Sequence, residues 1–166
     1  MQTTRPDPDQ LLQQITRDEA RAARGKLKIF FGACAGVGKT YAMLSAAHEQ
    51  QNNGVNVLIG VAETHGRSET AEQHNGLPQL AARQVDYRER ELAEFDLDSA
   101  LAAAPQLIVV DELAHSNVPG SRHTKRWQDI DELLAAGIDV YSALNVQHLE
   151  SLNDVVGRIT GTRVSE

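Results

Sequence analysis

Aromatic residues and basic charge are both scarce in this sequence of 166 residues. Phenylalanine, tryptophan and tyrosine make up 4% of it, and 23 acidic residues against 16 lysines and arginines give a net charge of -7. Few rings are therefore available to stack on nucleic-acid bases, and the acidic balance opposes binding to a phosphate backbone. We expect no nucleic-acid partner.

Cysteine and long apolar runs are also nearly absent. The single cysteine, Cys34, excludes an internal disulfide and a multi-cysteine metal site, and it suits a reducing compartment. The longest apolar run, residues 29–37, contains glycine and is far shorter than the roughly 20 residues of a membrane span. The first ten residues are polar and contain no signal-peptide core. We expect this stretch of chain to be soluble, without membrane contact of its own.

Strand and helix patterns alternate along most of the chain. An N-terminal amphipathic helix, residues 1–24 with Asp7 as its cap, comes before a domain spanning residues 25–166. In that domain, strand patterns occur at 26–31, 55–61, 107–110 and 138–144, and helical patterns at 41–51, 96–104, 124–137 and 149–156. Thr124 is the predicted cap of the third of these helices. Strand–helix–strand units require parallel pairing. The sequence predicts a three-layer α/β fold with a mainly parallel sheet, of the P-loop nucleoside triphosphatase type, with only a short strand at 81–87 in the irregular segment 63–94.

The segment Ala33-Cys34-Ala35-Gly36-Val37-Gly38-Lys39-Thr40 fits the phosphate-binding loop G-x-x-x-x-G-K-[ST], with alanine in place of the first glycine. Small residues let backbone N–H groups turn toward phosphate oxygens, and the following helix directs its positive end at the anion. In this pattern Lys39 reaches the β- and γ-phosphates and Thr40 holds Mg²⁺. A glycine-rich turn with a solvated lysine is the alternative, but the position between a strand and a helix favours a nucleotide site.

Two acidic residues, Asp111 and Glu112, follow the apolar strand at 107–110. Beside a phosphate loop, an aspartate in this position holds Mg²⁺ or its water, so Asp111 is a predicted nucleotide and metal ligand. Glu112 is the candidate general base for an attacking water. Acidic residues also end ordinary strands, and both interpretations of Glu112 stay open.

Other polar residues follow the second and the last predicted strand, where ligands of open α/β sheets bind. Glu63 or Gln147 is a candidate sensor of the γ-phosphate. Arg67 either contacts the ligand or forms a surface ion pair, and Asn145 either belongs to the site or caps a helix.

The polar segment 116–126 ends in basic residues. It is either a mobile lid, in which Arg122, Lys125 and Arg126 meet a phosphate or a partner, or a solvated loop. The six histidines form no helical H-x-x-x-H pair, so a metal site made from protein ligands alone is not expected.

Longer segments, among them GACAGVGKTYAML, VVDELAHSNVPGSRHTKRWQDIDELLAAGIDV and NVQHLESLNDVV, closely resemble the N-terminal cytoplasmic domain of the KdpD family of potassium-sensing histidine kinases. The resemblance begins at about Gly25 and continues to the end. It implies an input domain that binds ATP and Mg²⁺ in a two-component system regulating a potassium-uptake (kdp) operon. It also implies a cytoplasmic piece of a longer inner-membrane protein, with a kinase core in the same polypeptide and the response regulator KdpE as partner.

Three functions stay open at this point. In the first, ATP binding itself is the signal, because the phosphoacceptor and nucleotide boxes of a kinase core do not occur in this stretch. In the second, the same loop serves an ATPase or a phosphotransferase acting on a small molecule or protein, with Glu112 activating the nucleophile. In the third, the chain is a docking module that has lost nucleotide.

Overall fold

A four-stranded parallel sheet organises the residues that the computed structural model describes, which are 7–32, 38–62 and 76–160. Its strands are β1 (Leu27–Gly32), β2 (Val57–Val61), β5 (Leu107–Val110) and β6 (Asp139–Asn145). They lie in the order β1-β6-β5-β2, and every neighbouring pair is parallel. The prediction of an α/β fold with a mainly parallel sheet is confirmed.

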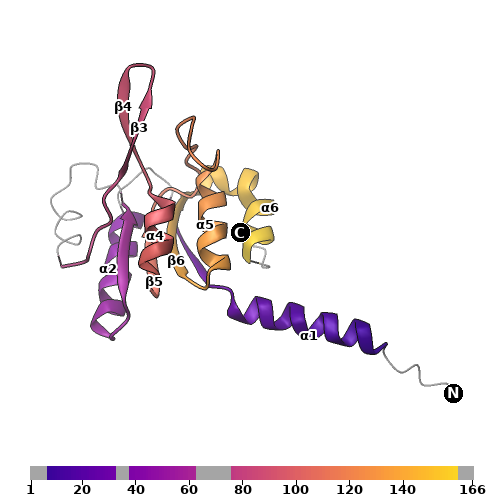
Figure 1. The fold of residues 1–166 in the computed structure, drawn as a ribbon. Coiled ribbons are helices and arrows are strands. Elements are labelled where there is room, and N and C mark those ends of the chain that lie inside the picture. Colours follow the sequence, from indigo (N-terminus) through magenta and orange to yellow (C-terminus); the bar gives the residue numbers. More distant parts are fainter. Residues whose placement is uncertain (1–6, 33–37, 63–75, 161–166) are drawn as a thin grey trace.

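Helices cover both faces of this sheet. Ile108 and Val110 of β5 belong to a core with the helices α4 (Leu97–Ala103), α5 (Arg126–Ala135) and α6 (Leu149–Thr160). Leu107 and Val109, which alternate with them, belong to a second core with α2 (Gly38–Asn52). In Figure 1, α4 and α5 lie in front of β5 and β6. Burial on both faces explains the unbroken apolar sequence of β5.

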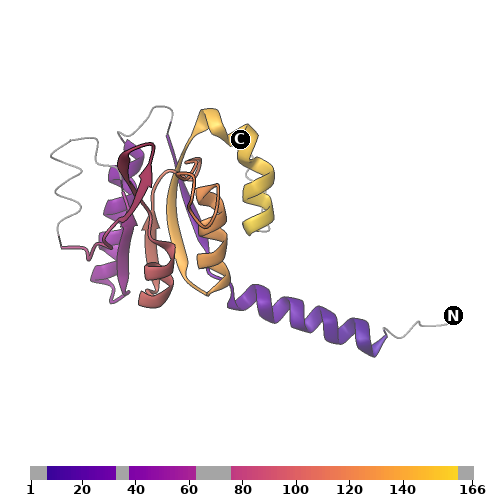
Figure 2. The same cartoon turned by 45° about the horizontal axis from the view of Figure 1, so that its top comes forward.

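The helix α1 (Pro8–Ala23) extends away from the sheet, as Figure 2 shows. Asp7 Oδ1 accepts a hydrogen bond from the Asp9 amide at 3.1 Å, which fits the predicted cap. Leu11, Leu12 and Ile15 are exposed along the helix. The predicted N-terminal helix is thus present, and its apolar stripe stands outside the two cores.

A close backbone contact fixes the end of α1 to the sheet domain. The Gly25 amide donates to Leu134 O at 2.8 Å, and a Cβ atom on Gly25 would lie 2.0 Å from Ile138 O. Only glycine therefore fits at this junction.

An antiparallel hairpin, β3 (Arg83–Tyr87) and β4 (Arg90–Glu94), projects from the body between β2 and α4 in the chain (Figure 1). The short strand predicted at 81–87 is confirmed, but its partner strand was not predicted. Arg88 and Glu89 form the turn with φ of 49° and 62°. Such turns usually contain asparagine or glycine, and because neither occurs here, the residue pattern contains no hairpin signal.

The helix α5 begins one residue later than expected. The predicted cap, Thr124, is wrong, because the N-cap residue is Lys125. Gln128 Oε1 accepts from the Lys125 amide at 3.0 Å and from Thr124 Oγ1 at 3.1 Å.

Across the described ranges, no helix is both long and apolar enough to cross a membrane.

Candidate functional site

The described part of the predicted phosphate loop is its end, where Gly38, Lys39 and Thr40 begin α2. Ala33, Cys34, Ala35, Gly36 and Val37 lie outside the described residues, as do Glu63 and Arg67. Within the described residues, the candidate site consists of the loop's last residues and the strand ends beside them.

Thr40 and Asp111 are brought together by the strand order. Both are 1% exposed, and Thr40 Oγ1 donates to Asp111 Oδ2 at 3.3 Å. Thr40 follows β1 and Asp111 follows β5, and β6 lies between these two strands in the sheet. The contact therefore depends on the order of three strands and not on one neighbouring pair. Two predicted metal ligands thus lie side by side.

Asp111 is fixed by contacts on its backbone and its side chain. Its amide donates to Val61 O at 2.9 Å, and its carbonyl oxygen accepts from Arg126 Nη1 at 3.0 Å. Its Oδ1 accepts from the Glu112 amide at 2.8 Å, and Glu112 has a φ of 57°. A left-handed conformation is unfavourable for a glutamate, and the contacts of its neighbour hold the turn in place.

Lys39 is 8% exposed, and its Nζ donates to Asn145 Oδ1 at the end of β6. Gly32, the last residue of β1, makes room for this lysine, since a Cβ there would lie 3.2 Å from Lys39 Cδ. The short helix η1 (Val146–His148) has no side-chain cap bond from Asn145. Of the two interpretations of Asn145, the structure favours a contact within the site.

A pocket of about 190 Å³ opens beside Lys39. Its walls come from the start of α2, the segment after β5, the end of β6 and η1. The lining residues are Lys39, Glu112, Ala114, His115, Ala143, Leu144, Asn145 and His148. Gln147, a predicted phosphate sensor, is exposed and does not line it. Among the residues that the structure describes, the pocket combines one ammonium group, one carboxylate, one amide and two imidazoles.

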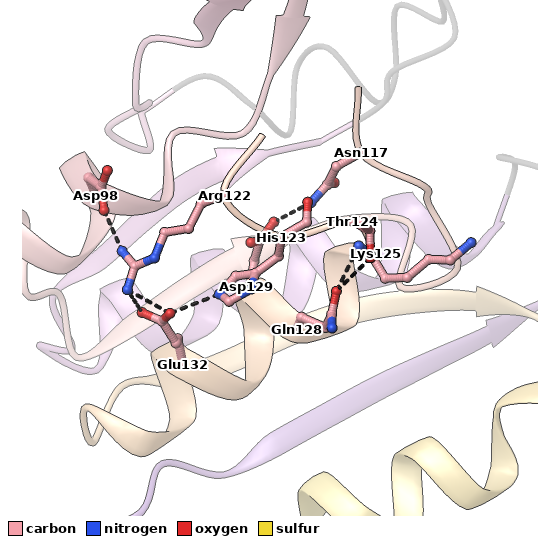
Figure 3. Close-up of polar contacts among 9 residues, drawn as sticks. All are labelled: Asp98, Asn117, Arg122, His123, Thr124, Lys125, Gln128, Asp129 and Glu132. Atoms are coloured by element: carbon pink, nitrogen blue, oxygen red, sulfur yellow. Dashed lines mark hydrogen bonds and ion pairs between the residues drawn. The ribbon is translucent and has the colours of Figure 1, made fainter. Parts of the chain in front are cut away.

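The segment 116–126 is tied to the two helices beside it, as Figure 3 shows. Arg122 lies between Asp98 of α4, at 2.6 Å, and Glu132 of α5, also at 2.6 Å. Lys125 Nζ donates to Ser116 Oγ at 2.7 Å. These cations bind other residues of the chain and do not line the pocket, which favours the interpretation as a surface loop over the lid.

Asp129 lies beneath this loop and accepts from Asn117 Nδ2 at 2.9 Å (Figure 3). Burial raises the pKa of its carboxyl more than the hydrogen bond from Asn117 and the charges of His123 and Arg126 lower it.

Arg126, the third cation of the loop, is buried at 3% exposure and forms the centre of an ionic cluster behind the pocket. Its Nη2 lies 3.5 Å from Glu94 Oε2, and Glu94 Oε1 lies 2.9 Å from His115 Nε2. Burial lowers the pKa of Arg126, although the neighbouring acidic groups oppose the shift. The cluster connects the end of the hairpin to the pocket wall.

Neither Glu94 nor His115 was singled out from the sequence. His115 follows the acidic pair by three residues, which was the available signal for it. Glu94 sits in a charged segment, RELAE, that resembles a surface strand, and no local signal marks it as buried.

The residues at the sheet edge suit a nucleotide with Mg²⁺. The Thr40 hydroxyl and the Asp111 carboxylate are the oxygen donors that Mg²⁺ prefers, and two such ligands leave its other positions to phosphate oxygens and water. Within the described ranges, no group of three or more histidine, cysteine, aspartate or glutamate residues could hold a metal.

Comparisons with known proteins agree on one family. Residues 23–166 match the KdpD family described as "Osmosensitive K+ channel His kinase sensor domain". The chain is 60% identical to the sensor protein KdpD of Escherichia coli K12 and 55% identical to that of Clostridium acetobutylicum, over 98% of its length in both. It is 51% identical to the sensor protein KdpD of Mycobacterium tuberculosis H37Rv over 86% of its length. It spans 18%, 18% and 17% of these relatives.

Proposed function

This chain belongs to the KdpD family of sensor proteins, and on that premise we propose that it binds ATP with Mg²⁺ at the edge of its sheet. The observation that carries the proposal is the contact between Thr40 and Asp111, which come from segments far apart in the sequence, next to the buried Lys39. A solvated lysine on an ordinary turn would not be 8% exposed and bonded to a strand end.

Each residue has a role in this proposal. Lys39 neutralises the β- and γ-phosphates, and Asn145 holds its ammonium group at the pocket. Thr40 and Asp111 hold the cation, which when bound screens the charge of the phosphates. The backbone of residues 33–38 contributes the phosphate cradle that the sequence pattern predicts. Binding, and not turnover, is then the event that a neighbouring domain detects.

The family description, a His kinase sensor domain, and the expectations drawn from the sequence resemblance extend the proposal beyond this chain. In a sensor kinase, nucleotide binding here would reach a kinase core in the same polypeptide and, through it, the response regulator KdpE and expression of the kdp operon. The chain would then be a cytoplasmic domain of an inner-membrane protein.

Calorimetric titration with ATP, GTP and ADP, each with and without Mg²⁺, tests the site. We expect Lys39→Ala to weaken ATP binding roughly 100-fold or more, because a buried charge-assisted contact to phosphate is lost. Lys26→Ala, at an exposed lysine before β1, is the matched control and should bind like the wild type. Unchanged ATP affinity in folded Lys39→Ala would refute the site.

A second function, ATP hydrolysis or phosphoryl transfer, is favoured by the position of Glu112. Glu112 lines the same pocket as Lys39, where a general base would lie near an attacking group. Steady-state turnover that Glu112→Gln abolishes while ATP still binds would support an enzyme. Turnover no faster than in buffer would support the sensor.

The docking alternative makes a different prediction for Cys34. Bound ATP with Mg²⁺ should protect this thiol from alkylation, because it lies within the phosphate-loop pattern. Equal labelling with and without nucleotide would favour a docking module.

A further inference from the structure

His115 forms part of the pocket wall and is fixed from behind. Its amide donates to Glu112 O at 2.9 Å, and its carbonyl oxygen accepts from the Arg126 amide at 3.0 Å. Its side chain is 31% exposed and lines the pocket, whereas its partner Glu94 is 4% exposed. One side of the imidazole thus meets a buried carboxylate while the residue itself borders the space beside Lys39.

The Glu94 carboxylate determines how this imidazole can bond. Burial alone raises the pKa of the Glu94 carboxyl, but hydrogen bonds from His115 and the Val118 amide, with the charges of His115 and Arg126, outweigh it and lower the pKa. Glu94 is therefore an acceptor at neutral pH, and the His115 Nε2–H donates to it at 2.9 Å. Nδ1 is the ring nitrogen that remains for a ligand.

We propose that His115 is a specificity-determining residue of the nucleotide site, which recognises the terminal phosphate of a nucleoside triphosphate and is positioned for this by Glu94. The inference rests on the proposed function, because Lys39 marks the end of the pocket at which the β- and γ-phosphates would lie. A diphosphate lacks the group that His115 contacts.

The charges around the pocket explain why such a contact is needed. A γ-phosphate here would lie near the Glu112 carboxylate, and among the described residues of the pocket wall Lys39 supplies the ammonium group. A histidine that carries a proton on each ring nitrogen has two donors, one for the Glu94 carboxylate and one for a phosphate oxygen. It then donates from Nδ1 to the phosphate and adds positive charge where the triphosphate exceeds the diphosphate.

His123 provides a matched control within the same loop. Its Nε2 is paired with Glu132 at 2.8 Å (Figure 3), and its side chain is 25% exposed, much like His115. It is not among the residues that line the pocket. If the loss of any histidine paired with a carboxylate affects binding, both His115→Ala and His123→Ala should show the effect. An effect on phosphate recognition should occur in His115→Ala alone.

The experiment compares ATP and ADP affinities, each with Mg²⁺, in the wild-type chain, His115→Ala, His123→Ala and Glu94→Gln. We expect His115→Ala to weaken ATP binding roughly 10-fold, because one charge-assisted hydrogen bond to the terminal phosphate is lost. ADP binding should weaken less than about 2-fold, because ADP lacks that phosphate. His123→Ala should keep the wild-type ratio of the two affinities. Glu94→Gln retains an acceptor oxygen but loses the charge, so its ratio should fall between those of the wild type and His115→Ala.

The outcomes separate this inference from the proposed function. Wild-type binding of ATP together with an unchanged ATP-to-ADP ratio in folded His115→Ala, verified by circular dichroism, would overturn the role of His115 and leave the nucleotide site standing. Equal weakening of both nucleotides would also overturn it. If the wild-type chain binds neither nucleotide, both the proposed function and this inference fail.

Discussion

Thr40 Oγ1 and Asp111 Oδ2 lie 3.3 Å apart at the edge of the sheet, in side chains that are each 1% exposed. This contact is longer than the usual O–H···O hydrogen bond of about 2.7–2.8 Å, so it is weak. Little stabilisation is lost when a cation takes up the same two oxygens. If the chain binds nucleotide as proposed, the pair would be pre-positioned for the metal that arrives with it.

The first prediction concerns the Mg²⁺ dependence of ATP binding. Asp111→Asn should leave ATP binding in EDTA close to that of the wild type, since Lys39 is untouched, but should remove most of the enhancement by Mg²⁺, roughly 10-fold or more. Asp98→Asn, at an exposed aspartate of α4, is the control. Titrations of each variant with ATP, with and without Mg²⁺, measure the enhancement of binding by the cation. If Mg²⁺ enhances ATP binding in Asp111→Asn as much as in the wild type, Asp111 is not the metal ligand.

The main features of the site could be predicted from the sequence because they depend on local spacing. Lys39 and Thr40 follow from one loop pattern, and Asp111 from the strand before it. Asn145 and His115 depend on which strands are neighbours, and the order β1-β6-β5-β2 is not encoded in any single segment. Their role in the pocket therefore required the structure.

The same distinction applies to the fold. The strand at 107–110 is apolar on both faces and was predicted with its observed bounds. The strand β4 was missed because three of its five residues are charged and four of its five positions are exposed. Arg126 was predicted to be a solvent-facing or ligand-binding cation, since the sequence does not show that Glu94 and the Asp111 carbonyl meet it in the interior.

The second prediction is that Arg126→Met strongly destabilises the fold. Removal of the guanidinium leaves the buried Glu94 carboxylate without its arginine partner and the Asp111 carbonyl without a donor. The loss of one partner from a buried ion pair lowers the free energy of unfolding by roughly 3–5 kcal/mol. Urea denaturation of the wild type and the variant measures the difference.

Arg122→Ala is the matched control for this measurement. Arg122 is also paired with two carboxylates, but its side chain is 46% exposed and those of Asp98 and Glu132 are 70% and 31% exposed. Exposed ion pairs stabilise by about 0–1 kcal/mol. Equal losses in the two arginine variants would contradict a buried cluster at Arg126.

The third prediction concerns the pH dependence contributed by Glu94. Its pKa is lowered in the folded chain from the ordinary value of 4.5, so the ionised carboxylate stabilises the fold above that value. The contribution is lost as the pH falls through the lowered pKa. The stability of the wild type relative to Glu94→Gln should therefore be constant near neutral pH and decrease as the pH falls below 4.5.

Glu91→Gln, at an exposed position of the same strand, serves as the comparison for this profile. The free energy of unfolding is measured by urea denaturation at a series of pH values for the three proteins. A difference between the wild type and Glu94→Gln that grows as the pH falls would contradict the assigned direction of the shift.

The fourth prediction concerns Gly60, where β2 shifts its register with β5. A Cβ atom at this position would lie 2.6 Å from Phe95 Cε2 and 3.1 Å from Val109 O, so Gly60→Ala forces the buried Phe95 ring to move. Overpacking of this kind lowers the free energy of unfolding by roughly 1–3 kcal/mol. Thermal or urea unfolding of the variant measures the loss.

A double-mutant cycle with Phe95→Leu tests whether the ring causes that loss. A leucine at position 95 lacks the ring atom nearest to the added methyl group, so the double variant should lose less stability than the sum of the two single variants, by about 0.5–3 kcal/mol. Gly54→Ala makes no close contact, and its φ of 88° gives a purely conformational comparison. If the losses of stability in Gly60→Ala and Phe95→Leu are strictly additive, the Phe95 ring is not the cause of the destabilisation. The contact with Val109 O, or the backbone conformation, would then explain the need for glycine.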